Sequence, residues 1–324
     1  MKEIILNKKN IVIVSHKNPD GDAIGSSLAL QNYLFKLGKE PVIILPDIFP
    51  NFYSWMKGSE DIVIADKLKE KANKLIASAD LIFCLDFNDL GRVGEIGEEI
   101  NSSNAYKVMI DHHQDPADFS DHIISDTTSC STAQLIYQFI QNNGDLDLID
   151  NSISEGIYTG IITDSGSFKY SNVQSITHLI AADLIKKGLD HSKIHENIFD
   201  QNELSRLQLL GYALNKIEIL PDVPVAFIAI SLKELKKFNI SKGATEGLVN
   251  YCLSIKDINV AAFLREDKEI IRMSFRSKGN IKVNEYASRN FDGGGHHNAA
   301  GGKSSLDFKS TVAKFKESIT QFLS

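Results

Sequence analysis

Cysteine is scarce in this chain of 324 residues, and its three copies lie far apart. Cys84, Cys130 and Cys252 form no CxxC pair, which argues against a zinc ribbon and against a redox motif. An odd number of cysteines in a chain of this length also argues against a disulfide framework. We expect free, mostly buried thiols in a reducing compartment.

Long apolar runs are also missing. The longest, such as residues 223–230, have the length of a strand, and none approaches the roughly 18 residues of a membrane span. The N-terminal sequence MKEIILNKKN contains no apolar run of signal-peptide length. We therefore expect a cytoplasmic protein without a membrane partner.

The chain has no excess of positive charge: 35 Lys and Arg residues stand against 42 Asp and Glu residues, for a formal net charge of -7. A protein that grips long duplex DNA usually needs a basic surface, so we do not expect that partner. A small nucleotide or a short strand can still be held by a local positive site. Bound divalent metals supply such charge without adding to the residue count.

Short apolar runs alternate with helical patterns in the first half of the chain. The runs are continuous rather than alternating, as expected for strands covered on both faces, and they lie at residues 11–15, 41–46, 81–86 and 108–111. Residues 23–38 have helical spacing and end at Gly38. Strands that alternate with helices predict an α/β fold with a parallel sheet.

The second half predicts a smaller α/β domain. Its strand-like runs at 259–267 and 269–279 resemble a hairpin, and a glycine-rich loop at 291–302 precedes a final helix. Helical patterns at 176–185 and 204–220 flank a polar, turn-rich stretch. The length of the chain also favours two domains. We place them at 1–190 and 211–324, joined by a linker at 191–210.

The segment SHKNPDGDAIGS contains three residues that commonly bind metals in hydrolytic sites, His16, Asp20 and Asp22. They follow a predicted strand at a spacing that lets a loop fold them toward one point. Two other interpretations stay open. The sequence Asn-Pro-Asp-Gly by itself strongly favours a turn. Asp22 could also cap the helix that follows.

Three more acidic or histidine positions follow apolar runs: Asp86, the triplet Asp111-His112-His113, and Asp164. A lone aspartate at a strand end is weak evidence, but two adjacent histidines after a buried strand are unusual. One imidazole can bind a metal while the other meets the substrate. In an open parallel sheet, side chains at the carboxyl ends of strands share one cleft.

Two histidines and four aspartates of these segments are enough for two metals that share a bridging carboxylate: His16, Asp20, Asp22, Asp86, His112 and Asp164. Such a pair, roughly 3.5–4 Å apart, can activate water and stabilise both oxygens of a phosphoryl transfer. The ligand types suit Mn²⁺ and also Fe²⁺, Co²⁺ and Zn²⁺.

His16-x-x-x-Asp20-Gly-Asp22, Asp86, Asp111-His112-His113 and Asp164 resemble, in order, the four motifs of the DHH phosphoesterase family. The sequence GGGHHNAAGG resembles the glycine-rich signature of the DHH-associated C-terminal domain. The resemblance covers nearly the whole chain and is strongest to the nanoRNase and pAp-phosphatase branch. It implies a manganese-dependent enzyme that degrades very short single-stranded RNA and converts 3′-phosphoadenosine 5′-phosphate (pAp) to AMP.

The resemblance also implies residue roles. One metal would be held by His16, Asp20 and Asp86, and the other by Asp22, Asp86, His112 and Asp164, with Asp86 bridging. His113 would face the substrate phosphate or the leaving group, and Asp111 would support it. A homodimer and a substrate cleft between the domains follow from the resemblance alone.

The second domain would bind the rest of the substrate. Gly294 and Gly295 let backbone N–H groups approach an anion, and His296 and Asn298 add side-chain donors. Arg276 resembles the strand arginine of the family, and its guanidinium fork suits phosphate. For Arg276 the alternative is a solvated edge-strand charge, and for the glycines it is a plain turn.

Two other functions remain open. Hydrolysis of cyclic di-AMP or of linear pApA would use the same ligands, so the first half of the sequence does not separate these substrates. A non-catalytic nucleotide-binding module would have residues that cannot bind a metal at some of the ligand positions, and none is seen. Pyrophosphate is less attractive, because the C-terminal glycine loop is not expected for it.

Overall fold

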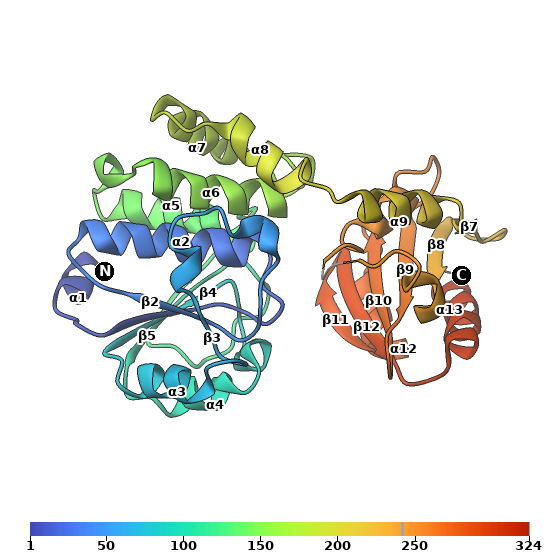
Figure 1. Ribbon diagram of the computed structural model, residues 1–324, viewed down its shortest axis with the longest axis horizontal. Coiled ribbons are helices and arrows are strands. Elements are labelled where there is room, and N and C mark those ends of the chain that lie inside the picture. Colours follow the sequence, from blue (N-terminus) through green and yellow to red (C-terminus); the bar gives the residue numbers. More distant parts are fainter. Residues whose placement is uncertain (241–242, 324) are drawn as a thin grey trace. The chain divides into compact units, whose positions relative to one another are not determined.

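The chain forms two units, Met1–Gln201 and Asn202–Ser324, in the computed structural model, which describes residues 1–240 and 243–323 (Figure 1). Within the described residues, no helix has the length and apolar character needed to cross a membrane. All three cysteines are free and buried, as expected from their spacing. Burial raises the pKa of the Cys84 thiol to about 12.

Continuous aliphatic runs form the parallel sheet of the first unit because both faces of these strands are covered. The strands are β1 (Ile11–Val14), β2 (Val42–Leu45), β3 (Val63–Ile64), β4 (Leu81–Leu85), β5 (Tyr106–Asp111) and β6 (His122–Ser125). Their order is β3-β2-β1-β4-β5-β6, and every pairing is parallel. The four predicted strands are the central ones, β1, β2, β4 and β5.

Helices cover this sheet on both faces (Figure 1). One face packs against α2 (Gly21–Lys36), α5 (Thr132–Asn142) and α6 (Asn151–Asp164), and the other against α3 (Lys69–Ala77) and α4 (Ile96–Ser102). The remaining helical elements are α1 (Lys2–Leu6), α7 (Ser175–Lys186), α8 (His191–Phe199), η1 (Asn51–Tyr53), η2 (Ser59–Asp61), η3 (Leu90–Val93) and η4 (Leu146–Leu148).

Helices α2 and α6 cross closely because glycines face each other. A Cβ placed on Gly25 would lie 2.4 Å from the carbonyl oxygen of Gly156, so no larger residue fits at this crossing. The crossing seats α6 against the part of α2 that carries Asp20 and Asp22.

The second unit is a mixed sheet between two helical layers. Its strands are β7 (Glu218–Ile219), β8 (Val225–Ile230), β9 (Val260–Glu266), β10 (Ile271–Ser277), β11 (Asp292–His296) and β12 (Ala299–Ser304), in the order β11-β12-β10-β9-β8-β7. One face packs against α12 (Val283–Asn290) and α13 (Phe308–Leu323), and the other against α9 (Leu204–Leu214), α10 (Leu232–Leu235) and α11 (Leu248–Leu253).

Residues 191–210, the expected linker, contain helix α8 and the first part of α9, where a helical pattern was predicted. Asp190 caps α8, and Ile194 and Ile198 bury its apolar side. Two predictions for this region need correction. The helical pattern at 204–220 ends at Leu214, and residues Glu218–Ile219 form strand β7. The glycine-rich loop is a hairpin, β11 paired antiparallel with β12. The hairpin predicted for residues 259–279 is confirmed as β9 and β10.

Candidate metal centre

Three neighbouring strands end at one place and deliver the first candidate ligands. His16 follows β1, Asp86 follows β4, and His112 and His113 follow β5. Because β1, β4 and β5 are adjacent and parallel, their carboxyl ends lie side by side. The structure thus brings together these residues, which the sequence placed at predicted strand ends.

Asp86 has an unusual backbone conformation. Its φ is +63°, in the left-handed region that few residues other than glycine adopt, and its N–H donates to the carbonyl of Ile110 at 3.1 Å. Strained backbone of this kind persists where the surrounding structure fixes it, and such residues cluster at functional sites. In this conformation the carboxylate of Asp86 lies beside His16 and His112, which follow the neighbouring strands.

The other candidate ligands come from helices. Asp20 caps α2 by accepting hydrogen bonds from the N–H groups of Asp22 and Ala23, both at 3.1 Å. The sequence-based alternative that Asp22 is the cap is therefore wrong. Asp22 lies inside the first turn of α2, and its two carboxylate oxygens accept the N–H groups of Thr132 and Ala133 at the start of α5.

Asp164 is the last residue of helix α6, so its expected place after a strand or in a loop is wrong. The apolar run before it reads like a buried strand because α6 is buried on nearly all sides, and such a helix loses its polar stripe. Asp150 caps the helix by accepting from the N–H of Ile153 at 3.1 Å.

Asp86 is the centre of the cluster, and its two carboxylate oxygens face different partners. Oδ2 lies 3.2 Å from Nε2 of His16, and Oδ1 lies 3.6 Å from Nε2 of His112. Nε2 of His16 is also 3.8 Å from Asp20, and Nε2 of His112 is 3.2 Å from Asp164. Asp86 thus lies between two sets of ligand atoms.

Three sets of side chains place their ligand atoms within 4.8 Å of one another. They are His16, Asp20 and Asp86; Asp22, His112 and Asp164; and Asp86, His112 and His113. The first set contains the residues of one ligand group implied by the family resemblance. The second contains those of the other group except Asp86, whose Oδ1 lies 3.6 Å from Nε2 of His112.

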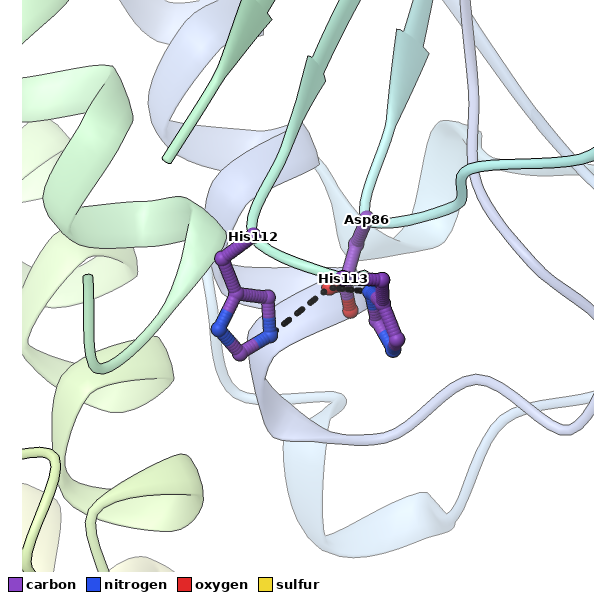
Figure 2. Close-up of side chains that lie close together, drawn as sticks. All are labelled: Asp86, His112 and His113. Atoms are coloured by element: carbon purple, nitrogen blue, oxygen red, sulfur yellow. Dashed lines mark ion pairs between the residues drawn. The ribbon is translucent and has the colours of Figure 1, made fainter. Parts of the chain in front are cut away.

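His113 lies next to His112 beside Asp86, with the two ring centroids 4.9 Å apart (Figure 2). Its Nδ1 is 2.7 Å from Oδ1 of Asp111, whose other oxygen accepts the backbone N–H of His113 at 3.0 Å. Asp111 is fully buried, whereas 13% of the His113 side chain is exposed. Asp111 therefore fixes the orientation of an imidazole that reaches solvent.

The tautomers of His16 and His112 fit metal binding. Nδ1 of His16 lies 3.0 Å from the carbonyl of Lys17, and Nδ1 of His112 lies 3.2 Å from the carbonyl of Ser129. A carbonyl only accepts, so each Nδ1 carries a hydrogen, and Nε2 is the nitrogen left to bind a proton or a metal. Each Nε2 faces carboxylate oxygens, so a cation between the two satisfies both.

The charges within the cluster favour the same conclusion. Loss of surrounding water, reinforced by Asp20 and Asp86, raises the pKa of Asp164 to about 7. Burial and the neighbouring carboxylates also raise the pKa of Asp22 well above its usual range. Against the effect of burial, hydrogen bonds to Asp20 and Asp86 raise the pKa of His16. Without a metal, the crowded carboxylates favour bound protons. Divalent metals can take the place of these protons, because carboxylates and imidazoles are among their usual ligands.

The predicted substrate residues of the second unit lie on β10, β11 and the turn after β11. Arg276, Ala299 and His296 are register partners across β10, β12 and β11, so they share one face of the sheet. Gly294 is two residues from His296 and lies on that face, where it is exposed. This face thus combines the cationic side chain of Arg276 with the exposed backbone of Gly294.

Gly295 and Asn298 have packing roles in the hairpin. A Cβ on Gly295, whose φ is +138°, would lie 2.6 Å from the carbonyl oxygen of Ala299, so glycine permits the close approach of β12. The amide nitrogen of Asn298 donates to Oγ of Ser277 and to the carbonyl of Gly279, both at 2.9 Å. The N–H groups of Asn298 thus hold the turn, and its contact with the substrate stays a prediction.

Sequence reasoning missed several residues around the centre. The hydroxyl of Thr132, at the start of α5, donates to Oδ1 of Asp86 at 3.1 Å. Gly160 lies against Asp22, and no sequence signal separates it from other helical glycines. Lys17 was also missed, and its backbone N–H donates to the carbonyl of Arg92 at 2.8 Å. Arg92 itself follows Asp86 in the sequence, which suggests either a phosphate contact or a loop salt bridge. Within residues 1–240 and 243–323, neither of these two side chains has a hydrogen bond or an ion pair.

Comparison with known proteins agrees with the two-domain fold. Residues 10–161 match the DHH family N-terminal domain, and residues 222–324 match the DHHA1 domain. The chain therefore belongs to the DHH family of phosphoesterases.

Three relatives show the range of the family. An exopolyphosphatase-related protein from Bacteroides fragilis is 40% identical and superposes with a TM-score of 0.96, covering 99% of this chain and 94% of that one. The bifunctional oligoribonuclease and PAP phosphatase NrnA of Thermus thermophilus is 28% identical and covers 97% of this chain and 90% of the relative. The cyclic-di-AMP phosphodiesterase GdpP of Bacillus subtilis is 23% identical and matches 99% of this chain but 49% of its own length.

Proposed function

We propose that this protein is a manganese-dependent phosphoesterase that hydrolyses very short RNA to mononucleotides and pAp to AMP. The observation that carries the proposal is the position of Asp86, whose Oδ2 faces His16 and whose Oδ1 faces His112. A carboxylate that is shared in this way is what two adjacent metals require. The oligoribonuclease and PAP phosphatase relative supports the choice of substrate.

The ligand assignment follows the two groups of side chains. His16, Asp20 and Asp86 would hold one Mn²⁺, and Asp22, Asp86, His112 and Asp164 would hold the other. Imidazole and carboxylate ligands suit Mn²⁺, although other divalent metals accept the same donors. His16 and Asp86 are nearly inaccessible, whereas 44% of the Asp20 side chain and 31% of the Asp164 side chain are exposed. Substrate would therefore reach the centre on the side of Asp20 and Asp164.

Two divalent metals, when bound, would supply an activated water and stabilise the charge that develops on the phosphoryl oxygens. His113 provides the proton chemistry. Its Nδ1–H is held by Asp111, so an imidazolium in this position presents Nε2–H toward solvent and can donate it to a leaving oxygen. Asp111 stabilises that imidazolium and keeps the ring from turning.

The side chains of Lys17 and Arg92 would bind the other phosphates of the substrate. Lys17 follows directly after His16, and its N–H donates to the carbonyl of Arg92. A short nucleotide with a second phosphate suits such a pair, since Arg donates two parallel hydrogen bonds to phosphate. In the second unit, Arg276, Gly294 and His296 would contact the rest of the nucleotide. The net charge of -7 is compatible with a small substrate bound locally.

A substrate panel tests the proposal. The full-length protein would be stripped of metal, Mn²⁺ would be added back, and pAp, RNA dimers to pentamers, pApA, cyclic di-AMP, pyrophosphate and short-chain polyphosphate would be compared. We expect metal-dependent release of mononucleotides from short RNA and of phosphate from pAp. Asp86→Asn is the inactive control, because the amide that it introduces cannot bridge two cations as a carboxylate does.

Other outcomes would assign another substrate to the same centre. Fast hydrolysis of cyclic di-AMP with slow hydrolysis of pAp would favour the activity named for the GdpP relative. Preferential cleavage of polyphosphate would favour the function in the name of the Bacteroides relative. Tight Mn²⁺ binding without turnover of any of these compounds would contradict the proposed substrates and leave a nucleotide-binding role.

A further inference from the structure

Helix α5 begins with N–H donors that a helix leaves without intrahelical acceptors. The side chain of Ser131, the N-cap, accepts the N–H of Gln134 at 3.1 Å. The N–H groups of Thr132 and Ala133 donate instead to the two carboxylate oxygens of Asp22, at 2.6 and 2.8 Å. Asp22 belongs to α2, more than a hundred residues earlier, so α5 fixes the orientation of a candidate ligand that another helix carries.

The same segment contacts two more candidate ligands. The hydroxyl of Thr132, which is fully buried, donates to Oδ1 of Asp86 at 3.1 Å. This is the oxygen that faces His112 and His113. Just before α5, the carbonyl of Ser129 accepts the hydrogen bond from Nδ1 of His112. Residues 129–133 therefore touch ligands from three separate parts of the chain.

We propose that Thr132 is a positioning residue of the metal centre, whose hydroxyl holds Asp86 in the orientation that lets its two oxygens serve two metals. A carboxylate with one oxygen tied to a fixed donor cannot rotate to give both oxygens to one side. The donated hydrogen bond uses one lone pair of Oδ1 and leaves another for a metal. The inference rests on the proposed two-metal function.

Loss of this hydrogen bond should weaken metal binding. Outer partners of metal ligands typically contribute 10- to 100-fold to metal affinity. Thr132→Val keeps the branched shape and removes the donor, and Thr132→Ser keeps the donor and removes a methyl group. If the hydroxyl positions Asp86, Thr132→Val should lose affinity and Thr132→Ser should retain it. If Thr132 only fills space, the serine variant should be the weaker of the two.

The experiment is calorimetric titration of Mn²⁺ into the metal-stripped full-length wild type and both variants, with thermal unfolding of the metal-free proteins measured alongside. We expect Thr132→Val to bind at least one Mn²⁺ 10- to 100-fold more weakly and Thr132→Ser to stay near the wild type. Wild-type affinity in Thr132→Val, or a greater loss in Thr132→Ser, would overturn the proposal. If Thr132→Val fails to fold, the serine variant decides alone.

The titration also separates this inference from the proposed function. Mn²⁺ binding is measured without substrate, so a wrong choice of substrate does not affect it. A wild type that binds no divalent metal would overturn the metal centre itself, and with it the role of Thr132. A wild type that binds two ions, with both variants unaffected, would overturn only the role of Thr132.

Discussion

Replacing Gly160 with alanine should disrupt the metal centre, although Gly160 has no side chain and is not a candidate ligand. Gly160 lies on α6, and a Cβ placed there would be 2.4 Å from Cβ of Ala133 and 2.5 Å from Oδ1 of Asp22. Neither atom is the end of a flexible side chain that can move away freely. Ala133 is in the first turn of α5, and its N–H holds that same oxygen of Asp22.

The magnitude follows from two opposing effects. Forcing a methyl group into a packed site costs about 1–3 kcal/mol. Alanine in place of glycine inside a helix increases the free energy of unfolding by about 1 kcal/mol. We therefore expect a loss of about 0–2 kcal/mol in the stability of the metal-free first unit. Metal affinity should fall further, by roughly 10- to 100-fold, because Asp22 and its donor from α5 are displaced together.

The assay pairs urea unfolding with Mn²⁺ calorimetry, and Gly211→Ala is the control. Gly211 lies on α9, where a Cβ meets no other atom of the described residues within 4 Å. This substitution should leave Mn²⁺ affinity unchanged and be neutral or stabilising by up to about 1 kcal/mol. Wild-type Mn²⁺ affinity in Gly160→Ala would refute the argument that close packing at α6 positions Asp22.

Three further predictions concern the chemistry. His113→Asn should lower kcat by about 10²- to 10⁴-fold with the number of bound Mn²⁺ ions unchanged; a loss of metal measured by elemental analysis would instead make His113 a ligand. Mn²⁺ affinity, measured by titration between pH 5.5 and 8.5, should fall as the pH drops below about 7, because the pKa of Asp164 is raised to about 7 and its proton must leave before a metal binds. A flat profile would contradict this competition. Arg276→Lys should raise KM for short RNA about tenfold, because lysine lacks the bidentate fork, while hydrolysis of a small phosphodiester without a nucleoside stays unchanged; equal loss on both would argue for misfolding.

The central strands and the residues at their ends could be predicted from the sequence. Strands β1, β4 and β5 are continuous aliphatic runs, and a parallel sheet places the residues that follow them at one edge. Knowing that His16, Asp86 and His112 follow such runs was therefore enough to expect them together. The edge strands β3 and β6 were missed because one is two residues long and the other is half-exposed.

Other parts of the site depend on contacts that local sequence does not encode. Asp164 is the last residue of helix α6. This helix is buried on nearly all sides, so its sequence lacks the polar stripe by which a helix is usually recognised. Thr132 looks like any residue at the start of a helix, and its bond to Asp86 joins positions 46 residues apart. The glycines of β11 were interpreted as a loop because glycine is common in turns. Here, a Cβ on Gly293 would lie 2.2 Å from the carbonyl of Gly301 in the adjacent strand.

The most direct test of the account is the number and coupling of bound Mn²⁺ ions, measured by elemental analysis and electron paramagnetic resonance on the full-length protein. The account predicts two Mn²⁺ per chain with the spectrum of an exchange-coupled pair, and loss of that coupling in Asp86→Asn. One ion per chain, or two ions whose spectra are independent in the wild type, would contradict a centre bridged by Asp86.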